Sequence, residues 1–208
     1  MPETLTLDVW SDVVCPWCWI GKQRVHNALA AAGLKAEWRF HAYELGERRQ
    51  ERRPTLGHLA EKYHVSLDEA REMVGRVRSL GAELGLDINP DKQQTAATFD
   101  AHRLIQAAGR GEALMERLHR AHFSEGQDVS DHAVLQTLAV EAGLDGAEAR
   151  RVLAGDAYAK EVEADEERAV AYAIGGVPFT MVNSRWAVGG AQSEDAFRQV
   201  FAEALKGA

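Results

Sequence analysis

The chain contains only two cysteines, Cys15 and Cys18, and their Cys-x-x-Cys spacing could support thiol–disulfide chemistry. Pro16 suits the first position of a helix, because the amide hydrogen that proline lacks would have no intrahelical partner there. Cys15 is therefore predicted to be a helix N-cap. The partial positive charge at a helix N-terminus favours a thiolate, so the sequence predicts a lowered pKa and the attacking role for Cys15. Cys18 is predicted to donate its backbone N–H to the Cys15 sulfur and to act as the resolving thiol.

A Cys-x-x-Cys pair can also be half of a zinc site, or simply two buried apolar residues. A zinc site needs two further ligands, and the chain has no other cysteine and no His-x-x-x-His pair. His119 and His122 are close enough in a helix to share a metal ion, but no cysteine or carboxylate pair in motif spacing accompanies them. We therefore expect no metal site, and the position of the cysteines between a strand pattern and a helix pattern favours the redox interpretation.

The elements around this motif follow from the periodicity of apolar residues. Alternation predicts strands over 4–11 and 36–43, and 3/4/7 spacing predicts a helix between them that ends at Gly33. From 46 to 174 only helix signals are found, including a capping box at Ser66. The other expected helices are around 95–108, 112–123, 131–142, 146–154 and 157–174, with Ser130 and Asp145 as candidate caps and Gly109, Gly143 and Gly175 as candidate stops.

Strand signals return after Gly176. Residues 179–188 predict a β-hairpin turning at Asn183-Ser184, and Ser193 is expected to cap a final helix. The sequence thus predicts an α/β protein with the thioredoxin-like pattern β-α-β … β-β-α and a large all-helical insertion. We expect a discontinuous thioredoxin-like domain over 1–45 and 176–208, and a helical insertion domain over 46–175.

Two segments carry a resemblance to a known family. DVVCPWCWIGK (residues 12–22) and GGVPF (residues 175–179) are similar to the FrnE-like branch of the DsbA family of thiol–disulfide oxidoreductases, and the similarity covers essentially the whole chain. The resemblance implies the same fold, a disulfide oxidoreductase and isomerase activity, and a cis-proline, Pro178, beside the active cysteines. Val177 and Pro178 would then offer a backbone edge to which a substrate segment pairs.

Three further residues are candidates for the same site. Trp17, between the cysteines, is expected to be exposed and to contact substrate, whereas Trp10 and Trp19 are expected in the core. Asp12 could accept a proton near the sulfurs or simply form a turn, and the sequence leaves both open. The resemblance implies that His102 faces the active-site cleft.

Composition limits the partners. The net charge of −8 argues against a nucleic-acid surface, and no apolar run reaches the length of a membrane span. Residues 1–9 show no signal-peptide pattern, so we expect a cytoplasmic protein. The expected partners are protein or small-molecule disulfides and dithiols, together with a thiol reductant or oxidant. No bound cofactor is expected, and glutathione is left open as a redox partner.

Two other functions fit parts of the sequence. Kappa-class glutathione transferases and hydroxychromene carboxylate isomerases are similar in overall architecture and act on glutathione-bound small molecules, but they typically have serine where Cys15 stands; the two cysteines argue against this class. A redox-gated binding or chaperone-like module is the third interpretation, for which the sequence offers only Trp17 as an exposed apolar contact.

Overall fold

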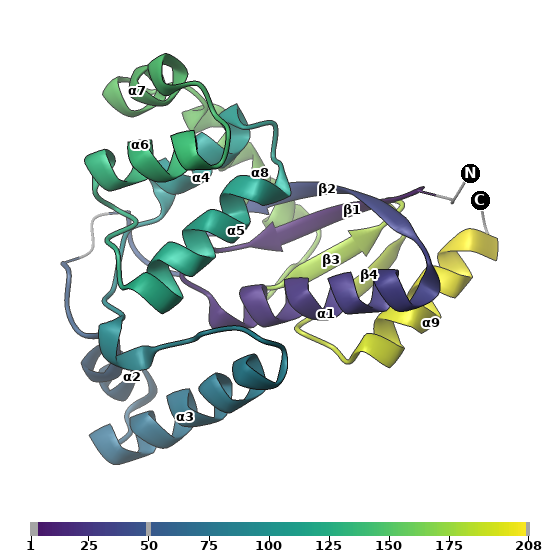
Figure 1. The fold of residues 1–208 in the computed structure, drawn as a ribbon, viewed down its shortest axis with the longest axis horizontal. Coiled ribbons are helices and arrows are strands. Elements are labelled where there is room, and N and C mark those ends of the chain that lie inside the picture. Colours follow the sequence, from purple (N-terminus) through teal and green to yellow (C-terminus); the bar gives the residue numbers. More distant parts are fainter. Residues whose placement is uncertain (1–3, 49–50, 207–208) are drawn as a thin grey trace.

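A computed structural model describes residues 4–48 and 51–206 (Figure 1). Residues 1–3 and residues 49–50, which belong to the charged segment 47–54, lie outside this range. The prediction of a cytoplasmic protein rests in part on residues 1–3. The elements are β1 (Thr4–Ser11), α1 (Pro16–Ala32), β2 (Lys35–Ala42), α2 (Thr55–Tyr63), α3 (Leu67–Glu83), η1 (Pro90–Lys92), α4 (Phe99–Ala107), α5 (Glu112–Arg120), η2 (Ala121–Glu125), α6 (His132–Glu141), α7 (Gly146–Ala154), α8 (Ala159–Ala171), β3 (Phe179–Val182), β4 (Trp186–Gly189) and α9 (Glu194–Lys206).

The sheet has the strand order β2-β1-β3-β4. β1 is parallel to β2 and antiparallel to β3, and β3 is antiparallel to β4. The β3–β4 turn falls at Asn183 and Ser184, both with positive φ, as the sequence predicts. Gly33 ends α1 in the left-handed conformation, which glycine adopts without steric cost. The predicted thioredoxin-like α/β fold with a helical insertion is confirmed, and the insertion separates β-α-β from β-β-α.

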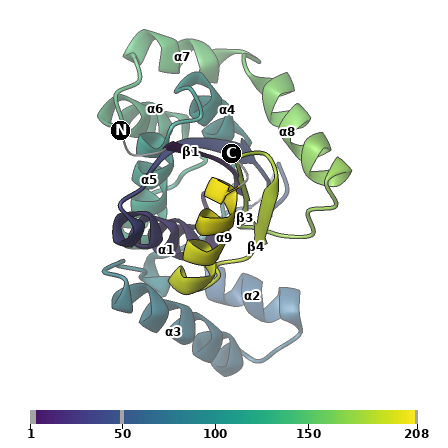
Figure 2. The ribbon, with the colours of Figure 1, turned by 90° about the vertical axis from the view of Figure 1, so that its right-hand side faces the viewer.

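Helices cover both faces of the sheet (Figures 1 and 2). Leu7 of β1 belongs to the same core cluster as Val25 of α1 and Phe201 of α9. Trp10, which alternation directs to the opposite face, packs with Ala169 of α8. The sheet therefore lies between α1 and α9 on one face and α8 of the insertion on the other.

A buried polar cluster attaches the insertion to the sheet. His41 of β2 lies 2.8 Å from Asp165 Oδ1 of α8, and Arg110, between α4 and α5, donates to the same oxygen at 2.8 Å. The Trp10 indole N–H donates to the Asp165 carbonyl oxygen. Because each buried charge has opposite or hydrogen-bonding partners, the cluster fixes α8 over the sheet.

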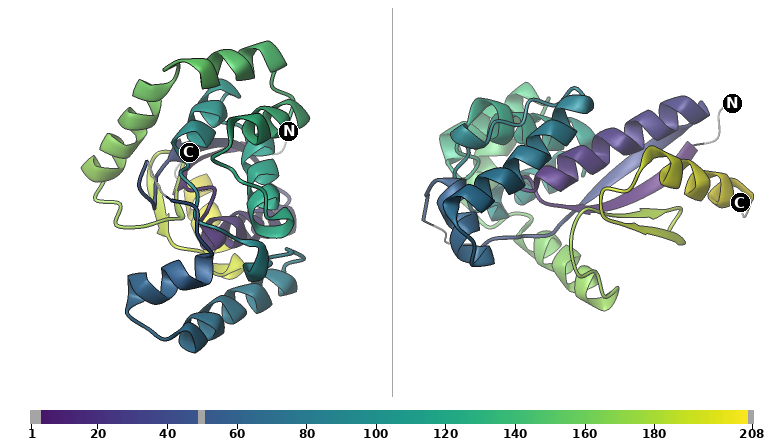
Figure 3. Two further views of the ribbon diagram at one scale, coloured as in Figure 1. Left: turned by 90° about the vertical axis from the view of Figure 1, so that its left-hand side faces the viewer. Right: turned by 90° about the horizontal axis from the view of Figure 1, so that it is seen from below.

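Helices α2 and α3 form a separate hairpin on the α1 side of the molecule (Figures 1 and 3). None of the residues of α2 is fully buried, and in α3 only Ala70 and Gly81 are. The capping box predicted at Ser66 is present, with Glu69 as its partner. The hairpin is thus held by helix–helix contacts while its apolar side chains keep partial exposure.

Several sequence predictions were wrong in detail. No separate helix was predicted at 55–63, where α2 forms. The N-cap of α6 is Asp131 rather than Ser130, because the Asp131 carboxylate accepts from Val134 N–H. α8 ends at Ala171, before the predicted stop at Gly175. In the part of the chain that the structure describes, no helix is both long and apolar enough to cross a membrane.

Candidate active site

The two cysteines lie at the start of α1. Cys15 is the extended N-cap residue and Pro16 is the first helical residue, as predicted. The Cys15 N–H donates to the Asp12 carbonyl oxygen at 3.2 Å, which forms the turn that leads out of β1. The Cys18 N–H donates to the Cys15 carbonyl oxygen at 3.0 Å and not to its sulfur, so the predicted sulfur cap is wrong. The Cys18 N–H is thus hydrogen-bonded to a backbone carbonyl, and the Cys15 sulfur does not accept a hydrogen bond from it.

Both thiols are free, and the two residues are only 3% and 2% exposed. Burial raises the pKa of the Cys18 thiol well above its ordinary value, and the neighbouring Cys15 raises it further. The Ser11 hydroxyl and the Asp12 amide oppose that rise. Cys18 is therefore a protonated thiol in the reduced protein at neutral pH.

The loop before β3 lies directly against Cys15. The Cys15 sulfur is 3.8 Å from the Val177 carbonyl oxygen, and the Val177–Pro178 peptide is cis. Pro178 packs on α1 at Gly21, where a Cβ atom would lie only 2.9 Å from the Pro178 ring. The chain thus brings together two segments that are about 160 residues apart, and Gly21 is what allows their close approach.

Replacing Gly21 with alanine is expected to destabilise the protein by about 1–3 kcal/mol, because the Pro178 ring and the α1 backbone must move apart. The measurement is urea unfolding. Gly75→Ala in α3 is the matched control: no atom beyond its own helix backbone lies within 4 Å of a Cβ there, so that substitution should stabilise by roughly 0.5–1 kcal/mol. A Gly21→Ala protein at least as stable as the Gly75→Ala protein would contradict this packing argument.

Asp12 is completely buried beside the cysteines, and its carboxylate faces several hydrogen-bond donors. Its carboxylate accepts the Leu45 N–H at 2.7 Å, and His102 Nε2 lies 3.3 Å from its other oxygen. Burial raises the pKa of Asp12, but the hydrogen bond and charge attraction of His102, with the donors of Leu45 and Thr98, outweigh burial and leave the pKa below its ordinary value of 3.8. Asp12 is therefore a buried carboxylate that ties the end of β1 to α4 and to the segment after β2.

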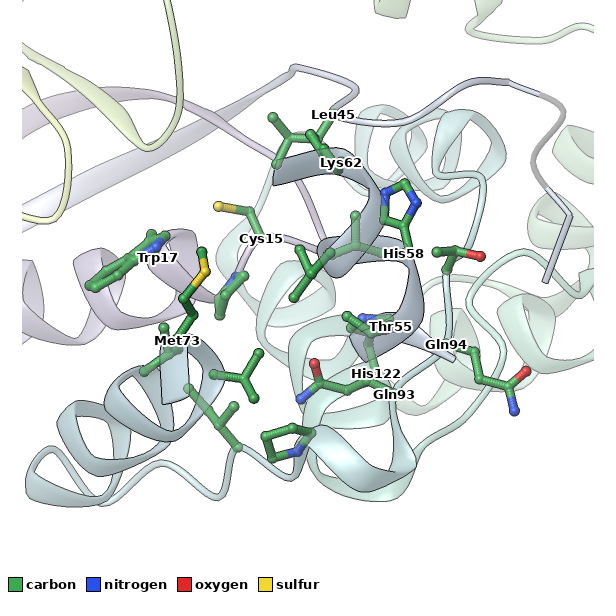
Figure 4. Close-up of a pocket in the computed structure, with 18 of the residues that line it drawn as sticks. Cys15, Trp17, Leu45, Thr55, His58, Lys62, Met73, Gln93, Gln94 and His122 are labelled. Carbon is green, nitrogen blue, oxygen red and sulfur yellow. The ribbon is translucent and has the colours of Figure 1, made fainter. Parts of the chain in front are cut away.

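The tryptophans follow the sequence prediction. Trp17 is 41% exposed, next to Cys15 in Figure 4, whereas Trp10 and Trp19 are buried. Trp19 stacks on Phe123 and donates its indole N–H to Glu116 at 2.9 Å. Trp17 is thus an exposed aromatic surface beside the buried thiols.

A cavity of about 400 Å³ opens beside Cys15 (Figure 4). Its wall is built from the first turn of α1, the loop after β2, helices α2 and α3, and residues 88–96. η2 is a π-helical turn, and it brings His122 to this wall. Burial lowers the pKa of His122 to about 4, so its imidazole is neutral at pH 7. Cys15 is therefore part of the wall of a partly open, mainly apolar space.

The structure gathers most of the sequence-predicted residues at one place. Cys15, Cys18, Val177 and Pro178 meet directly, and Asp12 connects them to His102. His119 is buried and faces the Asp12 carbonyl oxygen at 3.3 Å. Within residues 4–48 and 51–206, no three His, Cys, Asp or Glu side chains are grouped to hold a metal ion.

Sequence reasoning missed Ser11, Leu45 and all of the cavity wall contributed by residues 55–96. The spacing of apolar residues in α3 predicts a helix, but nothing in it indicates that this helix faces Cys15. Long-range contacts bring this wall to the cysteines. Leu45 N–H donates to the Asp12 carboxylate, and α3 contacts α1.

Comparison with known proteins gives a consistent result. The family model described as DSBA-like thioredoxin domain matches residues 6–202. A probable DsbA oxidoreductase, SCO1869 from Streptomyces coelicolor, is 36% identical with a TM-score of 0.89, over 97% of this chain and 90% of that one. The uncharacterized protein YwbO from Bacillus subtilis (strain 168) is 25% identical over 98% of each chain.

More distant structures share the fold alone. The cytosolic disulfide reductase DsbM from Pseudomonas aeruginosa, also solved with GSH, is 19% identical with a TM-score of 0.64, over 98% of this chain and 100% of that one. A 2-hydroxychromene-2-carboxylate isomerase is 13% identical with a TM-score of 0.61, over 97% of this chain and 94% of that one.

Proposed function

Because the chain belongs to the family of DSBA-like thioredoxin domains, which are thiol–disulfide oxidoreductases, we propose that Cys15 is its attacking sulfur and Cys18 its resolving sulfur. The observation that carries the assignment is the contrast between the two thiols. Cys15 belongs to the cavity wall, at the N-terminus of α1, whereas Cys18 lies one turn deeper with a raised pKa. The more accessible sulfur reacts first.

The reaction proceeds in two exchange steps. The Cys15 thiolate attacks one sulfur of a substrate disulfide; that S–S bond breaks, a Cys15–substrate disulfide forms, and the other substrate sulfur leaves as a thiolate and takes up a proton. Cys18 then loses its proton and attacks the Cys15 sulfur, which releases the second substrate thiolate. Two electrons pass to the substrate and the Cys15–Cys18 disulfide remains. The reverse sequence oxidises a dithiol, and attack without resolution allows disulfides to be reshuffled.

The Val177 carbonyl beside Cys15 and the exposed Trp17 suit the same role. An extended substrate segment would receive backbone contacts from the 177–178 loop and an apolar contact from Trp17. We further propose that the reaction takes place in the cytoplasm with a thiol such as glutathione as electron partner and no bound cofactor. The fold shared with cytosolic DsbM, which has been solved with GSH, is compatible with this.

The direct test is turnover. The reduced protein with an excess of dithiothreitol should accelerate reduction of the insulin disulfides, measured by precipitation of the free B chain. A rate equal to that of dithiothreitol alone, and no catalysed oxidation of a dithiol peptide by the oxidised protein, would refute the assignment.

Trp17→Ala is expected to lower kcat/KM for insulin reduction about tenfold, because truncating an exposed aromatic contact costs roughly 1–2 kcal/mol of binding. Val170→Ala, which also shortens an exposed apolar side chain, on α8, should leave the value unchanged. Equal kcat/KM values for the Trp17→Ala and wild-type proteins would show that Trp17 does not contact this substrate.

The cavity also supports a second candidate function, that of a glutathione-dependent transferase or isomerase acting on a small molecule. A partly open pocket beside the sulfur would suit a glutathione-bound ligand. This alternative predicts tight glutathione binding and full activity in a Cys18→Ser variant, whereas the dithiol mechanism needs both sulfurs.

A further inference from the structure

Apolar side chains that line the cavity beside Cys15 are partly exposed to solvent. Leu59 of α2 and Met73, Val74, Val77 and Leu80 of α3 all line it, and all five are only partly buried. Apolar side chains gain free energy when a ligand removes their remaining surface from water. A volume of about 400 Å³ lies in the range of small-molecule pockets, so the space suits a small, largely apolar molecule rather than a folded partner.

The charge of the lining differs from that of the whole protein. The chain has 32 Asp and Glu against 24 Lys and Arg, yet the cavity lining contains no Asp or Glu. It does contain Lys62 and Arg76, and neither forms an ion pair within residues 4–48 and 51–206. Nearby arginines behave differently: Arg53 pairs with Glu61, and Arg71 pairs with Asp68. The cations of the cavity are therefore available to an anionic ligand.

Gln93 supplies a third, independent observation. The residue is only 7% exposed and lines the cavity, and its amide nitrogen has no hydrogen-bond partner. A buried donor without an acceptor is rare and costly. In Figure 4, Gln93 and His122 lie on one side of the cavity and Cys15 and Trp17 on the other. A ligand with an acceptor at one end could meet Gln93 while its other end reaches Cys15.

We propose that this cavity binds a small dithiol or disulfide with an apolar body and a terminal carboxylate, its sulfurs at Cys15 and its carboxylate at the Gln93 amide, with the positive charges of Lys62 and Arg76 in the lining favouring the anion. The proposal names a substrate class for the proposed oxidoreductase and rests on that function. It accounts for the apolar walls, the missing carboxylates and the unpaired amide together.

Dihydrolipoate is a suitable probe, and dihydrolipoamide has a neutral carboxamide in place of its carboxylate. One dihydrolipoate thiolate attacks Cys15 of the oxidised protein, and the Cys15–Cys18 bond breaks as Cys18 leaves and takes up a proton. The second ligand thiolate then attacks the ligand sulfur that is bonded to Cys15, which releases the Cys15 thiolate and closes the dithiolane ring. Two electrons pass from ligand to protein, so no other reagent is needed.

The experiment compares the second-order rate constants of the two probes, followed by tryptophan fluorescence. The wild-type protein should prefer dihydrolipoate over dihydrolipoamide about tenfold, the size expected for a charge-assisted hydrogen bond. Gln93→Leu, and separately Lys62→Gln with Arg76→Gln, should bring the ratio close to one. Lys160→Gln, an exposed lysine of α8, is the matched control and should keep the wild-type ratio.

The outcomes separate this proposal from the function it rests on. If dithiothreitol reduces a Cys15–Cys18 disulfide in the wild-type protein but the two lipoyl probes react equally, the ligand class is wrong and the oxidoreductase stands. If the ratio is high but unchanged in the exposed Lys62→Gln/Arg76→Gln double variant, which should fold normally, the charge recognition lies elsewhere and the proposal fails. If no disulfide forms, the proposed function itself fails.

Discussion

Replacing Cys15 with serine should lower the rate of insulin reduction by roughly 10³-fold or more, because the hydroxyl cannot form the mixed disulfide on which both exchange steps depend. Cys18→Ser should behave differently. Cys15 can still attack, but nothing resolves the product, so the variant should accumulate a covalent Cys15–substrate disulfide. The measurement is the mass of the alkylated protein after mixing with a disulfide peptide, with turnover recorded in parallel.

The position of Cys18 explains this asymmetry. Cys18 is buried and does not line the cavity, whereas Cys15 does, so a bulky substrate disulfide meets Cys15 first. Burial and the neighbouring Cys15 also raise the pKa of the Cys18 thiol, which keeps Cys18 protonated until it resolves the mixed disulfide. Accumulation of the mixed disulfide in the Cys15→Ser variant instead of the Cys18→Ser variant would reverse the assignment. Unimpaired turnover in Cys18→Ser would support the glutathione-dependent alternative.

Asp12→Asn should destabilise the protein by about 2–3 kcal/mol at pH 7, because it removes the buried negative charge that faces His102. The neutral amide can still accept the Leu45 N–H but no longer presents a negative charge to the His102 ring. Urea unfolding measures the difference. Asp87→Asn is the matched control, since Asp87 is exposed, and it should change stability by less than about 0.5 kcal/mol.

The pH dependence has a definite sign. The folded-state pKa of Asp12 is below its ordinary value of 3.8, so its contribution is fully present well above pH 3.8 and is lost as pH falls through that value towards the folded-state pKa. The stability difference between wild type and Asp12→Asn should therefore shrink between pH 5 and pH 3. A difference that stays constant over this interval would mean that the lost charge is not the cause.

The sequence predicts those parts of the fold that depend on local signals. Alternation over 4–11, proline after Cys15 and glycine at position 33 each act within a few residues, and β1, α1 and its left-handed end form as expected. The Asn183-Ser184 turn is equally local. The strand–turn–helix context of the two cysteines follows from the same short-range rules, so the local structure of the candidate site was predictable.

Long-range contacts were not predictable in the same way. His102 is 90 residues from Asp12, and only the folded chain brings its imidazole to that carboxylate. α2 follows a charged segment and has weak signals of its own, so its role as a cavity wall depends on α3 and on residues 88–96. The predicted bond from Cys18 N–H to the Cys15 sulfur was wrong because the Cys15 carbonyl competes for the same donor. The domain boundaries at 45 and 176 stay predictions.

The most direct test of the dithiol mechanism is the equilibrium between reduced and oxidised protein in a series of glutathione redox buffers, read as the mass of the alkylated protein. The account predicts a reversible two-electron transition with an intramolecular Cys15–Cys18 disulfide and a midpoint between about −270 and −120 mV, the span of dithiol oxidoreductases. The midpoint would also show whether the protein acts as reductant or oxidant. If no intramolecular disulfide forms at any ratio, or only a glutathione adduct on one cysteine appears, the dithiol mechanism is wrong.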